Sequence, residues 1–137
     1  MGHSGCGAVK AVTAATQGHG HALEYNIPPL VDNIGPAVQR AIHDHKEAEG
    51  AAVVSYAIEE NVWQSVSDLF TKSAAARRLA SEGKIKVVGA LYDIGTGKVN
   101  WLPEGKVTKL LAAAEANPKK QTKEFAGEAP KAEKSHH

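Results

Sequence analysis

Hydrophobic residues recur with a helical period over much of this chain. Residues 8–16 are rich in Ala and Val and predict a first helix. Pro28 and Pro29 follow, and prolines are tolerated in the first turn of a helix. Beyond them, apolar residues return every three or four positions, at Leu30, Ile34, Val38, Ala41 and Ile42. This spacing predicts a second helix whose apolar stripe faces the core.

The segment 51–70 presents two patterns. Its first eight residues contain enough β-branched side chains to resemble a strand, but the longer run has an apolar period near 3.6. The positions that carry this period are Ile58, Val62, Val66 and Leu69. We therefore predict a helix over the whole segment. A shorter helix is predicted from Ser73 to Glu82, ending at Gly83, because glycine is common just after a helix.

The clearest strand signal lies at 85–93 and is followed by a turn at 94–98, which contains two glycines, and by a second apolar run at 99–102. This arrangement predicts a β-hairpin. The range 103–117 is predicted to be a C-terminal helix. A hairpin is marginally stable without further strands, and amphipathic helices need a sheet to cover. We therefore expect the strands that complete the sheet to lie outside this chain.

The range 118–137 has a different composition from the rest. It contains one aromatic residue, no aliphatic residue larger than Ala and many charges, so it is predicted to be a disordered charged tail. His136 and His137 are either native or the remainder of a purification tag, and we assign no metal site to them.

The charge balance and the single cysteine narrow the class of protein. The 16 basic and 15 acidic residues give a net charge of +1 and do not form a long block of one sign in the folded part, which predicts neither nucleic acid nor a membrane as partner. We find no apolar stretch approaching the roughly 20 residues of a membrane span. One cysteine excludes an internal disulfide, which favours a cytoplasmic protein.

Candidate metal chemistry lies near the N-terminus. His3 and Cys6 are three positions apart, with Gly5 between them to form a turn, and both residue types are preferred zinc ligands. Cys6 precedes the first predicted helix, whose N-terminal dipole favours the thiolate that binds metal. A catalytic zinc takes three protein ligands, so a third must be another His, an Asp or Glu, or a group on another chain. The alternative is a cysteine that merely packs.

The other histidines are weaker candidates. His19 and His21 lie in a glycine-containing loop, where histidines are mostly solvated. His43 and His45 are two positions apart near the end of a predicted helix and fall on different faces, so they are better explained as polar residues of a helix C-terminus than as a metal pair.

Three separated motifs carry a resemblance to a known family. The sequence from Gly2 to Val9 resembles the second zinc-ligand motif of the β-class carbonic anhydrases. Glu60-Asn61-Val62, with the apolar residues after it, resembles a helix of that family, and the range 88–99 resembles its C-terminal hairpin. The resemblance extends over residues 2–102, in the family's order. It implies an α/β fold, here a partial one in which most parallel strands of the sheet are missing.

The resemblance also implies an activity, namely the zinc-dependent interconversion of carbon dioxide and bicarbonate by a lyase. His3 and Cys6 would then be two of the three ligands of Zn²⁺. Family members carry another cysteine, with Asp and Arg two and four residues after it on an earlier strand, but this sequence has no Cys-x-Asp-x-Arg. We therefore expect 1–102 to be the C-terminal part of a carbonic anhydrase domain that lacks the catalytic Asp-Arg pair and the strand that delivers His3.

Three functions remain to be compared. The first is a carbonic anhydrase whose activity is impaired or absent in this chain alone. The resemblance to the family also implies a homo-oligomer, either a dimer or a tetramer. The second is a non-catalytic truncated paralogue that acts as a subunit or interaction module. The third is a hydrolase with a nucleophile elbow at Ser4, which fails because Gly-x-Ser-x-Gly requires glycine where Cys6 stands. A Cys6 nucleophile activated by histidine is open in principle but has no support from the two later motifs.

Overall fold

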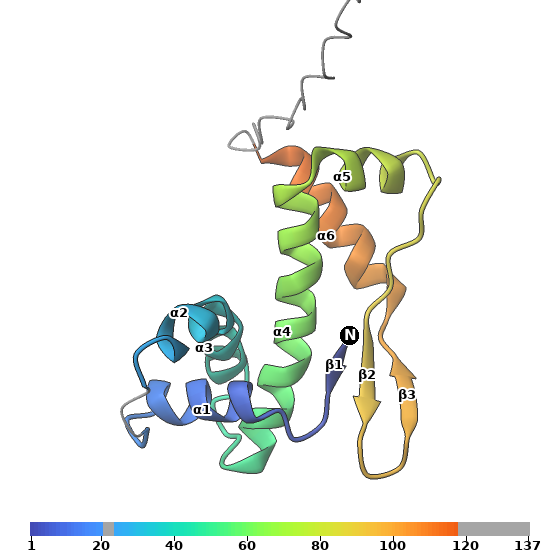
Figure 1. The fold of residues 1–137 in the computed structure, drawn as a ribbon. Helices are drawn as coiled ribbons and strands as arrows, with labels where there is room; N and C mark the ends of the chain where they lie inside the picture. Colours follow the sequence, from blue (N-terminus) through green and yellow to red (C-terminus); the bar gives the residue numbers. More distant parts are fainter. Residues whose placement is uncertain (21–23, 118–137) are drawn as a thin grey trace, which may run out of the picture.

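A long central helix, α4 (Ala51–Lys72), organises the molecule (Figure 1). The structure is a computed structural model that describes residues 1–20 and 24–117. In chain order the other elements are β1 (Gly2–His3), α1 (Gly7–Thr16), α2 (Ile27–Val31), the 3-10 helix η1 (Asp32–Ile34), α3 (Gly35–Asp44), α5 (Ala74–Ser81), β2 (Ala90–Asp93), β3 (Lys98–Trp101) and α6 (Glu104–Ala116). The predicted tail at 118–137 lies outside the described residues.

Helices α1 and α3 pack on the N-terminal half of α4 (Figure 1). The buried side chains of this cluster share an aliphatic character and are Val9, Val12, Val38, Ala41, Ala57 and Ile58. Each fully buried aliphatic side chain of this size stabilises the fold by about 1.5–3 kcal/mol relative to exposure. This cluster fixes the start of α1 against the rest of the molecule, and the candidate metal ligands lie next to that start.

Helices α5 and α6 pack on the C-terminal half of α4, around Trp63, Val66 and Phe70. Polar contacts also hold the helices together. The Glu60 carboxylate accepts from Arg40 Nε of α3 at 3.2 Å and from Lys106 Nζ of α6 at 2.7 Å. One acidic residue of α4 therefore joins the three helices.

The sheet has three strands in the order β1-β2-β3. Strands β2 and β3 form the predicted antiparallel hairpin, with Tyr92 opposite Val99, but residues 85–89 are not in a strand. Strand β1 runs parallel to β2, and Gly2 pairs with Leu91. The expectations that the hairpin is the whole sheet and that the strand delivering His3 is missing are therefore wrong. A two-residue strand is held by backbone pairing and leaves no alternating side-chain pattern to recognise.

Strand β1 approaches α4 so closely that only glycine fits at its first position. A Cβ atom on Gly2 would lie 2.8 Å from Val62 Cγ2 and 3.1 Å from Leu91 Cδ2. Contacts below 3.0 Å force a neighbour to move, so Gly2 allows the strand to enter between α4 and β2. The glycine at the start of the His-x-x-Cys motif therefore has a packing role.

The predicted helix beginning near Pro28 is divided into α2, η1 and α3. Pro36 lacks a backbone N–H and cannot donate to the preceding turn, so a continuous helix is interrupted there. Val38 and Ala41 of the predicted stripe are buried, whereas Leu30, which precedes the break, is 71 % exposed. In α4 the predicted stripe is correct except at Leu69, which is 41 % exposed.

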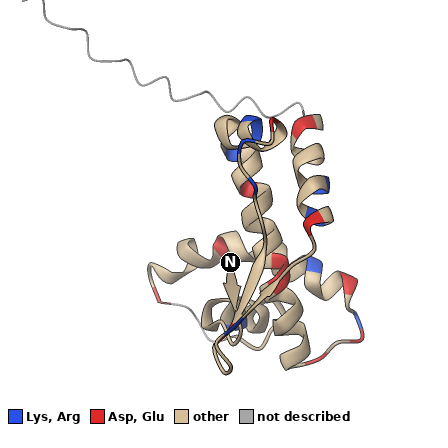
Figure 2. Cartoon of the chain, turned by 90° about the vertical axis from the view of Figure 1, so that its right-hand side faces the viewer, with Lys and Arg blue, Asp and Glu red and all other residues tan. Residues whose placement is uncertain are grey.

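Charged side chains of both signs are distributed over the helices, and neither sign forms a continuous face in Figure 2. Among the described residues we find no helix that is both long and apolar enough to cross a membrane.

Candidate metal site between β1 and α1

The two candidate ligands lie at the ends of the short loop that joins β1 to α1. His3 is the last residue of β1, and Cys6 is the residue immediately before α1. Gly5 between them has φ +66°, a left-handed conformation that glycine adopts without strain. The Cys6 carbonyl accepts the first helical bond from Lys10 N at 3.0 Å. Strand pairing on one side and helix initiation on the other therefore fix the backbone of both residues.

The His3 ring is oriented by a backbone carbonyl. Its Nδ1 lies 3.0 Å from Ser4 O, and a carbonyl oxygen can only accept a hydrogen bond. In the neutral ring Nδ1 therefore carries the hydrogen, and Nε2 keeps the lone pair with which imidazole binds a metal. His3 is exposed, so Nε2 is accessible to an incoming ion.

The Cys6 side chain is half-buried and not in a disulfide. It packs against the N-terminal hydrophobic cluster formed by α1, α3 and α4. The alternative role of Cys6, packing against the core, therefore agrees with part of its environment. Cys6 also directly precedes the first turn of α1.

A third ligand is missing from the part of the chain that the structure describes. Within 1–20 and 24–117 no group of three or more His, Cys, Asp or Glu side chains could hold a metal. His43 Nδ1 contacts Asp44 Oδ1 at 2.8 Å, and this hydrogen bond holds the pKa of Asp44 below its ordinary value. The His45 ring stacks on Tyr56 with centroids 3.5 Å apart.

Among the described residues, the loop histidine His19 does not complete the site. The His19 backbone N–H donates to Ala14 O at 2.8 Å, at the far end of α1, and His21 lies outside the described residues. The donor set of His3 and Cys6 therefore has the right chemistry for zinc, but it supplies two of the three protein ligands that a catalytic zinc takes.

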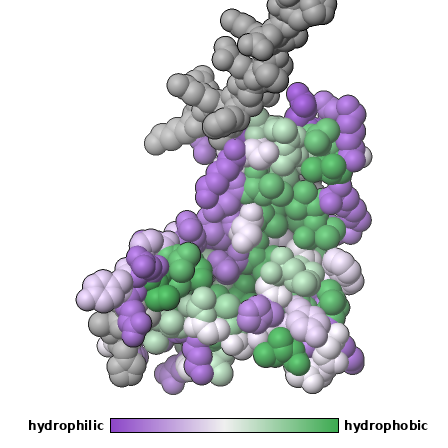
Figure 3. Space-filling view, in the orientation of Figure 1, coloured by the Kyte–Doolittle hydropathy of each residue, from purple (hydrophilic) through white to green (hydrophobic). Residues whose placement is uncertain are grey.

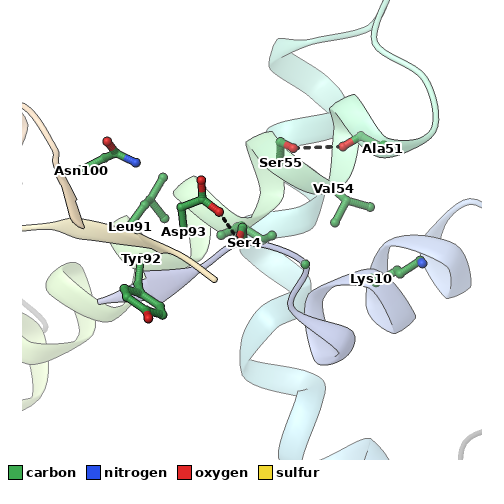
Figure 4. A pocket seen from close by; sticks show the side chains of 11 residues that line it. Ser4, Lys10, Ala51, Val54, Ser55, Leu91, Tyr92, Asp93 and Asn100 are labelled. Atoms are coloured by element: carbon green, nitrogen blue, oxygen red, sulfur yellow. Dashed lines mark hydrogen bonds between the residues drawn. The ribbon is translucent and has the colours of Figure 1, made fainter. Parts of the chain in front are cut away.

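Ser4 and Asp93 connect the loop to the hairpin, and sequence reasoning missed this connection. The Ser4 hydroxyl donates to Asp93 Oδ1 at 3.3 Å (Figure 4). It also accepts from Ile94 N at 3.0 Å. The two side chains are 89 positions apart, so no local pattern joins them. The available signal was Asp93 at the start of the turn, a residue type that organises turns through its side chain.

The Asp93 carboxylate is held by its own turn. Thr96 Oγ1 donates to Oδ2 at 2.8 Å and Gly95 N donates to Oδ1 at 2.9 Å. Hydrogen bonds to the charged form, first that of Thr96 and then that of Gly95, lower the pKa of Asp93 below its ordinary value of 3.8.

A pocket of about 430 Å³ lies beside this connection, between α4 and the sheet (Figure 4). Val54, Ile58 and Leu91 form part of its apolar wall, and Ser4, Lys10 and Asp93 add polar groups. His3 and Cys6 do not line it. The pocket is therefore adjacent to the candidate ligand pair and separate from it.

Comparison with known proteins decides the family. A sequence model described as carbonic anhydrase matches residues 1–99. The chain belongs to the β-class carbonic anhydrase family. The resemblance inferred from the three motifs is thereby confirmed, including the hairpin that ends the matched range.

Solved structures agree at the level of the fold. The crystal structure of the β-carbonic anhydrase CafA of the fungal pathogen Aspergillus fumigatus superposes with a TM-score of 0.61 at 21 % identity. The match covers 84 % of the present chain and 54 % of CafA, so the present chain spans about half the length of that structure. The predicted partial β-carbonic anhydrase fold is confirmed. No match was found among curated proteins.

Proposed function

We propose that this chain supplies His3 and Cys6 to a zinc site that serves the reversible hydration of carbon dioxide to bicarbonate and a proton. The observation that carries the proposal is the loop between β1 and α1. It presents an imidazole with a free Nε2 and a cysteine at a helix N-terminus within one turn of backbone. Membership in the carbonic anhydrase family makes a lyase reaction of this kind the best-supported use of that pair.

The residues of the chain contribute binding and orientation to this chemistry. His3 offers Nε2 because Ser4 O holds its Nδ1 hydrogen, and Cys6 offers a sulfur from the residue that directly precedes α1. Zinc, when bound at such a pair, acts as a Lewis acid toward water. The apolar walls of the adjacent pocket would suit an uncharged substrate such as carbon dioxide better than an ion.

The site needs groups that the chain does not provide. A catalytic zinc takes three protein ligands, and this sequence contains one cysteine and no Cys-x-Asp-x-Arg. We infer that the third ligand and the Asp-Arg pair come from another polypeptide segment. This chain by itself is then expected to bind zinc weakly and to be impaired or inactive in carbon dioxide hydration.

The test of the ligand pair is a cobalt titration, in which bound thiolate is detected by its charge-transfer absorption. The wild-type chain is expected to show this band. Cys6→Ser is expected to abolish it, and His3→Ala to weaken cobalt binding by at least about tenfold, the factor typical of a lost site group.

The matched control is His43→Ala, which removes an exposed histidine of α3. All variants should carry His136→Ala and His137→Ala, because terminal histidines bind metal on their own. If His3→Ala and Cys6→Ser titrate as wild type, the proposed site is wrong.

We also propose that the chain acts as a dimer or tetramer in the cytoplasm, and an exposed apolar face of the hairpin supports the self-association. Tyr92, Val99 and Trp101 share one face of the hairpin because they occupy paired and alternate positions of β2 and β3, and all three are exposed. Hydrophobic surface is also visible where α4, α6 and the sheet meet (Figure 3). An apolar sheet face of this kind suits contact with a second copy of the chain.

A non-catalytic subunit is the alternative function, and the missing third ligand favours it. Carbon dioxide hydration should be measured by stopped flow for the chain alone and after mixing with a complete member of the family. Activity that rises above that of the complete member supports a contributed site, and unchanged or reduced activity in a stable mixed complex supports a non-catalytic subunit.

A further inference from the structure

Every polar atom of Ser4 has a partner in the structure. Its backbone N–H donates to Tyr92 O at 2.9 Å, and its hydroxyl donates to Asp93 Oδ1 and accepts from Ile94 N. Its carbonyl oxygen accepts from His3 Nδ1. One small residue thus joins the imidazole ring to the hairpin.

The contacts on the hairpin side are themselves rigid. Asp93 cannot rotate freely, because Gly95 N and Thr96 Oγ1 hold its two oxygens. Gly97 N also donates to Asp93 O at 2.8 Å and closes the turn. The Ser4 hydroxyl is therefore fixed by a preformed turn, and together with the Ser4 N–H contact to Tyr92 O it holds the residue whose carbonyl faces the His3 ring.

We propose that Ser4 and Asp93 are positioning residues that hold the His3 imidazole in the Nδ1–H form with Nε2 free for a metal. The part of this inference that concerns metal rests on the proposed function, whereas the part that concerns the ring does not. If Ser4 served only to pair β1 with β2, its backbone N–H contact to Tyr92 O would be sufficient. The hydroxyl contacts to Asp93 and Ile94 add a second anchor for the same residue.

Energetics favour a real orienting effect. Ile94 N donates to the Ser4 hydroxyl at 3.0 Å, an ordinary hydrogen-bond length, and the 3.3 Å contact of the hydroxyl with the charged Asp93 carboxylate adds a longer bond. Groups that orient a metal-binding histidine typically change metal affinity by about 10–100-fold when removed. The expected loss of affinity in a Ser4 variant therefore lies in that range.

The first experiment reads the His3 ring without any metal. Nitrogen-15 NMR of the imidazole at alkaline pH distinguishes the two neutral forms, and comparison with His3→Ala assigns the signals. The wild-type chain is expected to show the Nδ1–H form. Ser4→Ala and Asp93→Ala are expected to give a mixture of both forms, and Ser4→Thr, which keeps the hydroxyl, is expected to restore the wild-type spectrum.

The second experiment measures cobalt affinity and thermal unfolding in the same variants. Ser4→Ala is expected to lose about 10–100-fold in affinity. Ser55→Ala is the matched control, because Ser55 also lines the pocket but its hydroxyl donates only to Ala51 O of its own helix. This control should match the wild type in ring form, affinity and unfolding temperature.

The outcomes separate the two proposals. A wild-type ring spectrum in both Ser4→Ala and Asp93→Ala overturns the positioning role, and so does unchanged affinity in a variant whose ring form has shifted. If Ser4→Ala does not fold, Asp93→Ala decides the question, since it leaves the Ser4 backbone contact intact. If even the wild-type chain fails to bind cobalt, the zinc proposal fails, while the metal-free ring spectrum still tests the positioning of His3.

Discussion

The Asp93 carboxylate organises both its own turn and the contact with Ser4. Asp93 ends β2, receives bonds from two residues of the following turn and accepts a bond from Ser4. All of these bonds favour the charged form, which lowers its pKa. The unfolded chain lacks these bonds, so Asp93 there has the higher, ordinary pKa. The stabilisation by Asp93 is therefore present above that ordinary value and is lost as the pH falls through the lower, folded value.

We therefore predict a pH-dependent difference between the wild type and Asp93→Asn. At about pH 7 the wild type should be the more stable, because its charged carboxylate receives the hydrogen bonds, and at about pH 3 the difference should narrow. Urea unfolding at the two pH values measures it. Asp44→Asn is a useful comparison, since the pKa of that exposed carboxyl is lowered mainly by one hydrogen bond with His43. A difference between the wild type and Asp93→Asn that grows toward acid would contradict this assignment.

Ser73 offers a second residue-level test. Its hydroxyl accepts from Ala76 N at 3.1 Å and caps α5. Ser73→Ala should lower the free energy of unfolding by about 1 kcal/mol, whereas Ser73→Asp, which keeps an acceptor, should retain most of it. Chemical denaturation measures both. Equal stability of the Ala and Asp variants would show that the cap contributes nothing.

At the residue scale, sequence reasoning identifies the candidate donors but not the residues that contact them. His3 and Cys6 were identifiable because they are three positions apart and of metal-binding types. Ser4 was visible in the same motif, but its partner Asp93 lies 89 positions away. A contact of that range depends on the fold, and no local periodicity reports it.

At the scale of elements, the period of apolar residues was a good guide where the backbone is uninterrupted. It predicted α4, the longest helix of the described residues, because Ile58, Val62 and Val66 all face the core. It failed around Pro36, where the missing N–H outweighs a continuous apolar stripe. The apolar run at 85–89 also misled, because β-branched residues favour strands only where a neighbouring strand is available to pair.

Two adjacent residues of α4 test how the helix is packed. Phe70 of α4 is fully buried in the cluster that α4 forms with α6, whereas Leu69 is 41 % exposed. Phe70→Ala should lower the free energy of unfolding by about 3–5 kcal/mol, the usual cost of a large cavity. Leu69→Ala is the matched control and should cost much less. Thermal or urea unfolding decides, and similar losses in both variants would show that the two side chains are not packed as described.

At the scale of the whole molecule, the chain presents an apolar sheet face and spans about half of the solved relative. Trp101 is 72 % exposed on that face. Trp101→Lys should weaken self-association, because a charge at the centre of an apolar contact must lose its hydration. Sedimentation velocity over a range of concentrations measures the change. The control is Tyr25→Lys, since Tyr25 is 99 % exposed and lies in another part of the chain. If both variants and the wild type sediment as monomers, the proposal that a second copy of the chain covers the hairpin is wrong.

The parallel pairing of β1 with β2 has a consequence for the order of folding. The strand that fixes His3 is synthesised about ninety residues after the donor pair, by the separation of Ser4 and Asp93. Contacts that are distant in sequence form late, since a long loop must close first. A nascent chain therefore exposes its thiol and imidazole before they are oriented. In the proposed zinc site, metal capture would then be a late event, which coincides with completion of the hairpin.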